Sequence, residues 1–160
     1  MLARLNLPRR RGPKPETTHG LPHAQVTQHG PDDVVDQMHD WAFSLLGVDE
    51  AHSLVSVPGA RALVMHDRVA CNHNAFMIDR EFAHFHPHPD NGSMHVQLPS
   101  EDALEIVEKN WGEHHTLVLK GHRAVGLVMV YSPRDETELT AIKSILGRSY
   151  EYATGHEVSA

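Results

Sequence analysis

Apolar residues recur at helical spacing in two long stretches of the chain. In the first, they lie three and four positions apart from Val34 to Leu46, between Pro31 and Gly47. Proline is favoured at the first position of a helix and glycine just after its last, so this pattern predicts a helix. A second amphipathic stretch over residues 135–152 predicts a long C-terminal helix.

Short apolar runs separated by turn residues lie between these two helices. Residues 52–57 and 60–66 flank Pro58-Gly59, and residues 76–86 and 93–98 flank Asp90-Asn91-Gly92. Proline, glycine and asparagine favour tight turns because of the backbone angles they adopt. Each pair of runs therefore predicts a β-hairpin.

The predicted elements follow the order helix, several strands, helix, strand, helix. The middle helix starts near Ser100, and residues 125–131 form an apolar run typical of a buried strand. This order indicates an α+β fold, with helices packed on one face of a mainly antiparallel sheet. We expect residues 30–156 to form a single domain. Residues 1–29, rich in proline and basic side chains, are expected to be a flexible leader, with residues 1–25 contributing nothing to the core.

Composition narrows the classes of function. A formal net charge of −7 argues against nucleic-acid binding, which relies on neutralising phosphates. No run approaches the roughly 20 apolar residues of a membrane span. The single cysteine, Cys71, cannot form an internal disulfide, which fits a cytoplasmic protein. The sequence indicates no oligomeric state.

Histidine is unusually abundant, with 15 in 160 residues. His84 and His86 are two positions apart in a predicted strand, so their side chains leave the same face. His95 in the next strand alternates with apolar residues at positions 94, 96 and 98. The second hairpin is therefore predicted to have one apolar face and one face on which His84, His86 and His95 share a solvent-reachable pocket.

Imidazoles gathered on one sheet face have three possible roles. They can bind a metal such as zinc, transfer protons near neutral pH or simply contact water. Strand alternation places Asp79 and Glu81 on the face opposite His84, so no mixed histidine and carboxylate ligand set is expected. A buried Glu81 is expected to pair with Arg80 or Arg134.

Three further positions are candidates for binding or catalysis. His115 follows the middle helix, where it either complements the helix dipole or faces the same pocket. Tyr131 and Arg134 frame the start of the last helix, where they either bind an anionic or phenolic ligand or have ordinary packing and surface roles.

Several blocks of residues, in order and spacing, resemble the fungal luciferase family and its bacterial luciferase-like relatives. The blocks are Arg80-Glu81-x-Ala83-His84-x-His86, Met94-His95-x-x-Leu98, Lys109-x-Trp111-Gly112-x-x-His115 and Tyr131-x-Pro133-Arg134-x-Glu136. The fungal enzymes add dioxygen to a pyrone, 3-hydroxyhispidin, without metal or flavin. The resemblance thus implies an oxygenase-like protein with a small aromatic or enolic substrate, dioxygen as partner and no cofactor.

The resemblance also implies roles for individual residues. One histidine would deprotonate the substrate and the others would orient it, the candidates being His84, His86, His95 and His115. The implied substrate-binding residues are Glu81, Trp111, Tyr131 and Arg134, and the loop over residues 117–125 would border the pocket. Two alternatives stay open from the residues alone: a metal-binding enzyme or domain that uses His84, His86 and His95, and a binding module without enzymatic activity.

Overall fold

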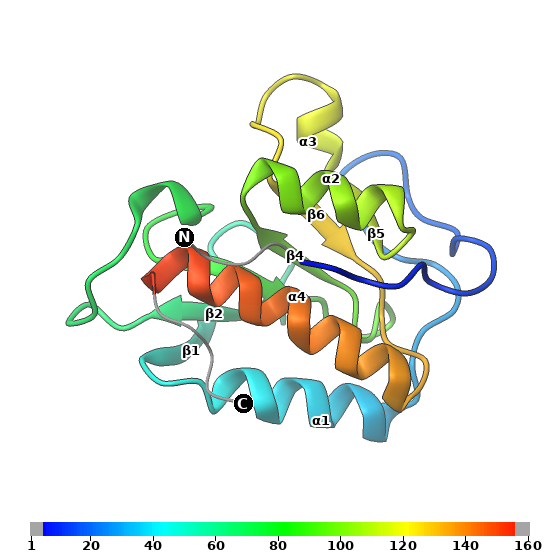
Figure 1. Ribbon diagram of the computed structural model, residues 1–160, viewed down its shortest axis with the longest axis horizontal. Helices are drawn as coiled ribbons and strands as arrows, with labels where there is room; N and C mark the ends of the chain where they lie inside the picture. Colours follow the sequence, from blue (N-terminus) through cyan, green and yellow to red (C-terminus); the bar gives the residue numbers. More distant parts are fainter. Residues whose placement is uncertain (1–4, 156–160) are drawn as a thin grey trace.

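A six-stranded antiparallel sheet forms the centre of the molecule (Figure 1). The structure is a computed structural model and describes residues 5–155. The strand order is β1-β2-β3-β4-β6-β5, and each neighbouring pair is antiparallel. The predicted α+β class is confirmed. The elements are α1 (Asp32–Phe43), β1 (Val48–His52), β2 (Arg61–Met65), the 3-10 helix η1 (His73–Ala75), β3 (Glu81–Phe85), β4 (Met94–Gln97), α2 (Ser100–Glu108), β5 (Gly112–His114), α3 (Thr116–Leu119), β6 (Leu127–Val130) and α4 (Glu136–Thr154).

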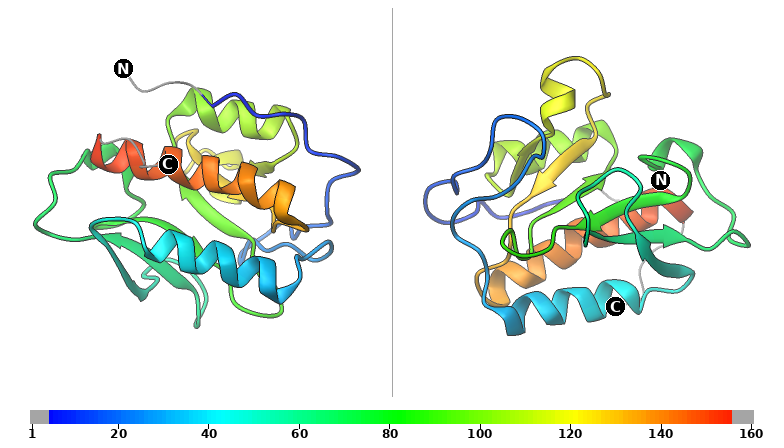
Figure 2. Two further views of the ribbon diagram at one scale, coloured as in Figure 1. Left: turned by 60° about the horizontal axis from the view of Figure 1, so that its bottom comes forward. Right: turned by 180° about the vertical axis from the view of Figure 1, so that it is seen from behind.

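Helices α1, α2 and α4 cover one face of the sheet (Figure 1). Seen from behind, the opposite face of the sheet lies in front of α1 and α4, and the N-terminal segment runs beside it (Figure 2). An amphipathic helix gains stability by burying its apolar stripe, and these helices do so against the sheet. The histidine side chains of β3 and β4 lie on the face of the sheet that these helices do not cover.

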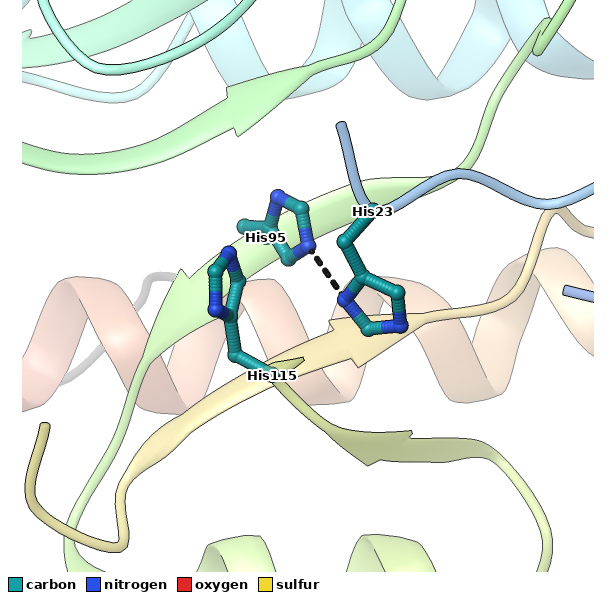
Figure 3. A group of neighbouring side chains, drawn as sticks. All are labelled: His23, His95 and His115. Carbon is teal, nitrogen blue, oxygen red and sulfur yellow. Dashed lines mark hydrogen bonds between the residues drawn. The ribbon is translucent and has the colours of Figure 1, made fainter. Parts of the chain in front are cut away.

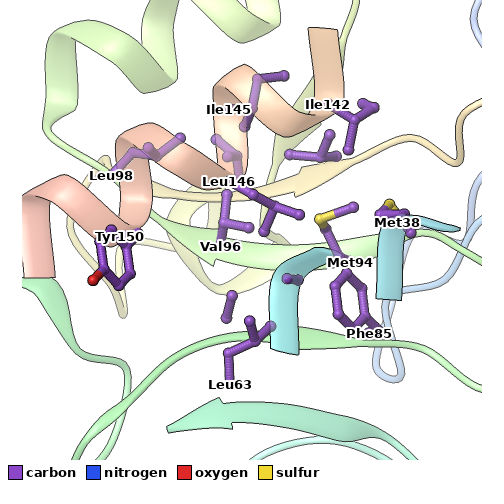
Figure 4. Packing of buried hydrophobic residues seen from close by; sticks show 14 of the residues in the cluster. Met38, Leu63, Phe85, Met94, Val96, Leu98, Ile142, Ile145, Leu146 and Tyr150 are labelled. Carbon is purple, nitrogen blue, oxygen red and sulfur yellow. The ribbon is translucent and has the colours of Figure 1, made fainter. Parts of the chain in front are cut away.

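The core fills the space between the sheet and the helices (Figure 4). Met94, Val96 and Leu98 point into it, as the alternation in this strand predicted. They meet Ile142 and Ile145 of α4, and all five side chains are at most 1% exposed. Burying an aliphatic side chain of this size contributes about 1.5–3 kcal/mol, so the core fixes which way each strand faces.

A β-bulge interrupts the pairing of β2 with β3. Leu63 is opposite Ala83, whereas the next residue, Val64, is opposite Glu81, so Phe82 is an extra residue in β3. Phe82 and Ala83 are both in the core. Because a bulge shifts the alternation by one residue, Glu81 lies on the same side as His84. The expectation that Glu81 lies on the opposite face is therefore wrong.

The two long helices were predicted within a few residues, and the strands less well. The first hairpin exists, but its first strand is Val48–His52, earlier than expected. Strand β5 and helix α3 were not predicted, because three- and four-residue elements carry no readable period. Asp135 caps α4 by accepting a hydrogen bond from the Glu138 backbone N–H.

Residues 5–30, here called the strap, pack along the domain without helix or regular strand, and fold back once through an antiparallel bridge between Thr17 and Gln25. Leu7 is 6% exposed and belongs to the core, and the Trp111 indole donates a hydrogen bond of 2.6 Å to the Pro8 carbonyl. The Gly30 N–H donates to Ser132 Oγ, and a Cβ at Gly30 would lie 1.8 Å from the Pro133 carbonyl oxygen. The predicted flexible leader is therefore wrong for residues 5–29; residues 1–4 lie outside the described part of the chain.

Within residues 5–155, none of the helices is long and apolar enough to cross a membrane.

Replacement of Leu7 tests whether the strap stabilises the domain. Leu7→Ala should lower the free energy of unfolding by about 2 kcal/mol, the lower end for a buried leucine, because Leu7 lies at the edge of the core. Urea denaturation measures this change. Leu46→Ala is the matched control, since Leu46 is 86% exposed and should change stability by less than about 0.5 kcal/mol. Equal effects of the two variants would mean that the strap is not packed.

Candidate functional site

A pocket of about 870 Å³ opens on the sheet face opposite α4. Its walls are mostly apolar and come from the strap and from the connection between β1 and β2. The wall residues include Leu21, Pro22, Val26, Val55, Val57 and Pro58. We call it the histidine pocket, because a group of imidazoles also lines it.

The structure brings together the four histidines that the sequence singled out as catalytic candidates. His84 in β3 lies opposite His95 in β4 in the strand register, and His86 directly follows β3. His95 Nδ1 is 3.1 Å from His84 Nε2 and 2.9 Å from His86 Nε2. His115 precedes α3, and its ring centroid lies 4.5 Å from that of His95. His95 is therefore the centre of the cluster.

A fifth histidine, His23, comes from the strap (Figure 3). His23 Nδ1 lies 3.0 Å from His95 Nε2, and its Nε2 lies 2.9 Å from Glu113 Oε2. The strap thus contributes directly to the site. Sequence reasoning missed His23, because it lies in a proline-rich segment without strand or helix period.

Acidic side chains contact the outer nitrogens of two of the histidines, and one of them, Asp90, also lines the pocket. Glu81 Oε2 is 2.8 Å from His84 Nδ1, and Asp90 Oδ2 is 3.0 Å from His86 Nδ1. Glu81 also accepts hydrogen bonds from the Ser53 hydroxyl and the Leu54 N–H, and does not pair with Arg80 or Arg134. A carboxylate behind an imidazole fixes its orientation and makes its other nitrogen a better base or ligand.

Burial keeps the central imidazoles uncharged. Desolvation lowers the pKa of His84, and together with the neighbouring imidazoles it brings the pKa of His95 well below its usual value. Desolvation and the nearby His23 lower the pKa of His115 to about 4. Burial alone would raise the pKa of Glu81, but its hydrogen bonds from His84, Leu54 and Ser53 bring it below the usual value. Near neutral pH, a neutral His84 therefore faces an ionised Glu81.

The other residues expected to bind substrate do not line the pocket. Trp111 is in the core, and the Tyr131 hydroxyl donates to Glu113 Oε1 at 3.0 Å. Arg134 forms an ion pair with Glu138. These three residues have packing and hydrogen-bonding roles. The loop over residues 117–125 does border the pocket, as expected, through Leu117 and Arg123.

Part of the chain is similar to a known protein family. Residues 79–149 match the model of the family described as the luciferase domain. This range contains four of the five clustered histidines, all except His23. The resemblance to fungal luciferases that the sequence blocks indicated is therefore confirmed for this range.

The similar proteins are luciferases of two fungal genera. Those of Armillaria mellea and Armillaria gallica are 35% identical over 77 residues, which are 47% of this chain and 29% of theirs. The luciferase of Neonothopanus nambi is 32% identical over 77 residues, or 28% of its length. The matched segment thus spans less than a third of these relatives. No solved structure matches the chain.

The buried histidines predict how stability depends on pH. An unfolded histidine titrates near pH 6.5, whereas His115 in the folded chain titrates at about 4. Between these values the unfolded state binds more protons, so the free energy of unfolding should fall as the pH falls from 6.5 toward 4. Urea denaturation at pH 7, 6 and 5 measures the slope.

Two substitutions test whether His115 causes this dependence of the free energy of unfolding on pH. His115→Gln should flatten it, and the exposed His122→Gln should leave it unchanged. Stability that is constant from pH 7 to 5 would show that these rings do not stay neutral in the folded state.

Proposed function

We propose that this protein binds a small aromatic or enolic molecule in the histidine pocket and promotes its reaction with dioxygen. The observation that carries the proposal is the combination of apolar walls with a floor of neutral imidazoles. Apolar walls suit a flat organic ring. The imidazoles of the floor can accept a hydrogen bond from an oxygen atom of the bound molecule or donate one to it.

The first step is removal of a proton from an enol or phenol. Neutral imidazole is a suitable acceptor at physiological pH. Glu81 behind His84 and Asp90 behind His86 would stabilise the imidazolium that forms. The proton moves from the substrate O–H to the imidazole. The electron pair left on the substrate then forms a carbon–oxygen bond with dioxygen; the ring carbon is oxidised, and dioxygen is reduced to a peroxide bound to that carbon.

His115 has a different role in this proposal. Its Nδ1 accepts a hydrogen bond of 3.0 Å from the Leu117 N–H, so in the neutral ring the hydrogen is on Nε2. This N–H can donate to the substrate oxygen as negative charge develops there. The names of the relatives, which are luciferases, support an oxidation of this kind.

Oxygen uptake tests the proposal. The purified protein, with a panel of pyrones, phenols and catechols, should consume dioxygen with at least one compound. His84→Gln should lower the turnover number by roughly 10²–10⁴, as expected for a lost general base, and His122→Gln should not. Because burial lowers the pKa of His84 and His95, activity should persist below pH 6.5 and fall only toward more acidic pH.

Two results would contradict this function. Binding of a panel compound without oxygen uptake would indicate a binding module. An equal loss of turnover in His84→Gln and His122→Gln would mean that the cluster is not where the reaction occurs.

A further inference from the structure

Three imidazole nitrogens converge at the floor of the histidine pocket. His95 Nδ1 lies 3.1 Å from His84 Nε2 and 2.9 Å from His86 Nε2. The three side chains are between 3% and 5% exposed. Nitrogens this close must have a hydrogen or a cation between them, because two lone pairs at this distance repel each other. The position of the hydrogens follows from what the other ring nitrogens contact.

The outer nitrogens of His84 and His86 both face carboxylates. Glu81 Oε2 is 2.8 Å from His84 Nδ1, and Asp90 Oδ2 is 3.0 Å from His86 Nδ1. An ionised carboxylate only accepts hydrogen bonds, so His84 Nδ1 carries a hydrogen. His86 Nδ1 also lies 2.7 Å from Ser93 Oγ; because the Ser93 hydroxyl donates to Asp90 Oδ2, its oxygen accepts from His86, and this Nδ1 carries a hydrogen as well. A neutral imidazole has a single N–H, so Nε2 of both rings presents a lone pair.

The same reasoning gives the hydrogen position in His95. His23 Nε2 lies 2.9 Å from Glu113 Oε2 and therefore carries a hydrogen. A neutral His23 then accepts at Nδ1, which is 3.0 Å from His95 Nε2. The single hydrogen of His95 is on Nε2, and its Nδ1 also presents a lone pair. In the neutral cluster, three lone pairs face one another.

A metal ion would use all three lone pairs at once. We propose that His84, His86 and His95 bind one divalent transition-metal ion such as Zn²⁺. Zinc–nitrogen bonds of about 2.0–2.1 Å with tetrahedral geometry place the nitrogens about 3.3 Å apart. The two contacts of His95 need only small outward shifts to reach this spacing, and all three nitrogens already lie within 4.8 Å of one another. Three histidines leave a fourth coordination position open, and here that position faces the pocket.

The surroundings match those of known metal-binding histidines. Such a histidine donates its second ring N–H to a carboxylate or another acceptor. Glu81 does this for His84, and for His86 the acceptor is Ser93 Oγ, whose hydroxyl donates in turn to Asp90. For His95 the acceptor is His23, which Glu113 holds in turn. All three proposed ligands are therefore oriented by a hydrogen-bond partner.

A second group, His23, His95 and His115, is also close enough to hold a metal ion. It is the less suitable set. His115 Nδ1 accepts the Leu117 N–H, so its Nε2 carries a hydrogen and offers no lone pair. Binding there would break that hydrogen bond. His115 thus stays available to a substrate beside the ion.

Metal binding goes beyond the proposed function, and because the ion would occupy the Nε2 lone pairs of His84 and His86, proton transfer to these rings belongs to the metal-free protein. Binding can be measured without any substrate. The whole protein is stripped with a strong chelator, dialysed, and titrated with zinc by calorimetry and with cobalt by visible absorption. We expect one ion per chain and the intense absorption of tetrahedral cobalt. Glu81→Gln, which keeps the ligands but weakens the support of His84, should lower affinity 10- to 100-fold. His84→Gln should lower it further.

Matched variants separate the possible sites. His115→Gln and the exposed His122→Gln should bind zinc as tightly as the unmodified chain. Loss of binding in His115→Gln would assign the ion to the other histidine group and overturn the proposal. Absence of binding to the folded, unmodified chain would also overturn it and mean that an extra proton relieves the lone-pair conflict. Cobalt absorption of the unmodified chain and of Glu81→Gln remains decisive if His84→Gln does not fold.

Discussion

The properties of the site depend on the number of N–H groups on its buried imidazoles. The neutral rings have fewer N–H groups than their close nitrogen–nitrogen contacts require. His95 lies at the centre of β4 with His84, His86 and His23 in hydrogen-bond contact with its two nitrogens. Buried polar groups need partners, because leaving one unpaired costs about 1–3 kcal/mol. Glu81, Ser93 and Glu113 each accept a hydrogen bond from the outer nitrogen of one ring, and too few ring hydrogens remain for the contacts around His95. This constraint connects the strap to the sheet and creates a place for a cation.

The fold makes this arrangement possible because the two faces of the sheet present different side chains: apolar residues face the helices, and imidazoles face the pocket. Alternation in β4 directs Met94 and Val96 toward the helices and His95 toward the pocket. The bulge in β3 adds Phe82 to the core and turns Glu81 toward the histidines. The apolar side fixes the register of the strands, and the register then sets the distances between the imidazoles.

The predictable features are those with a regular period. Helical spacing gave α1 and α4, and the alternation around Asp90-Asn91-Gly92 placed His84, His86 and His95 on one face. The bulge at Phe82 was not predictable, because it is a property of the pairing with β2, and without it Glu81 was assigned to the wrong face. His23 was missed for another reason: the strap has no period, and its position depends on single contacts such as that of Trp111 with Pro8.

The placement of hydrogens in the cluster is the central claim, and nuclear magnetic resonance of the imidazole nitrogens tests it most directly. In the metal-free protein with ¹⁵N-labelled histidine at pH 7.5, long-range proton–nitrogen correlation spectra should show hydrogen on Nδ1 of both His84 and His86. Single His→Gln variants assign the signals. A ring with hydrogen on Nε2 and none on Nδ1, in either His84 or His86, would contradict the account, because its carboxylate partner would then not hold it as described.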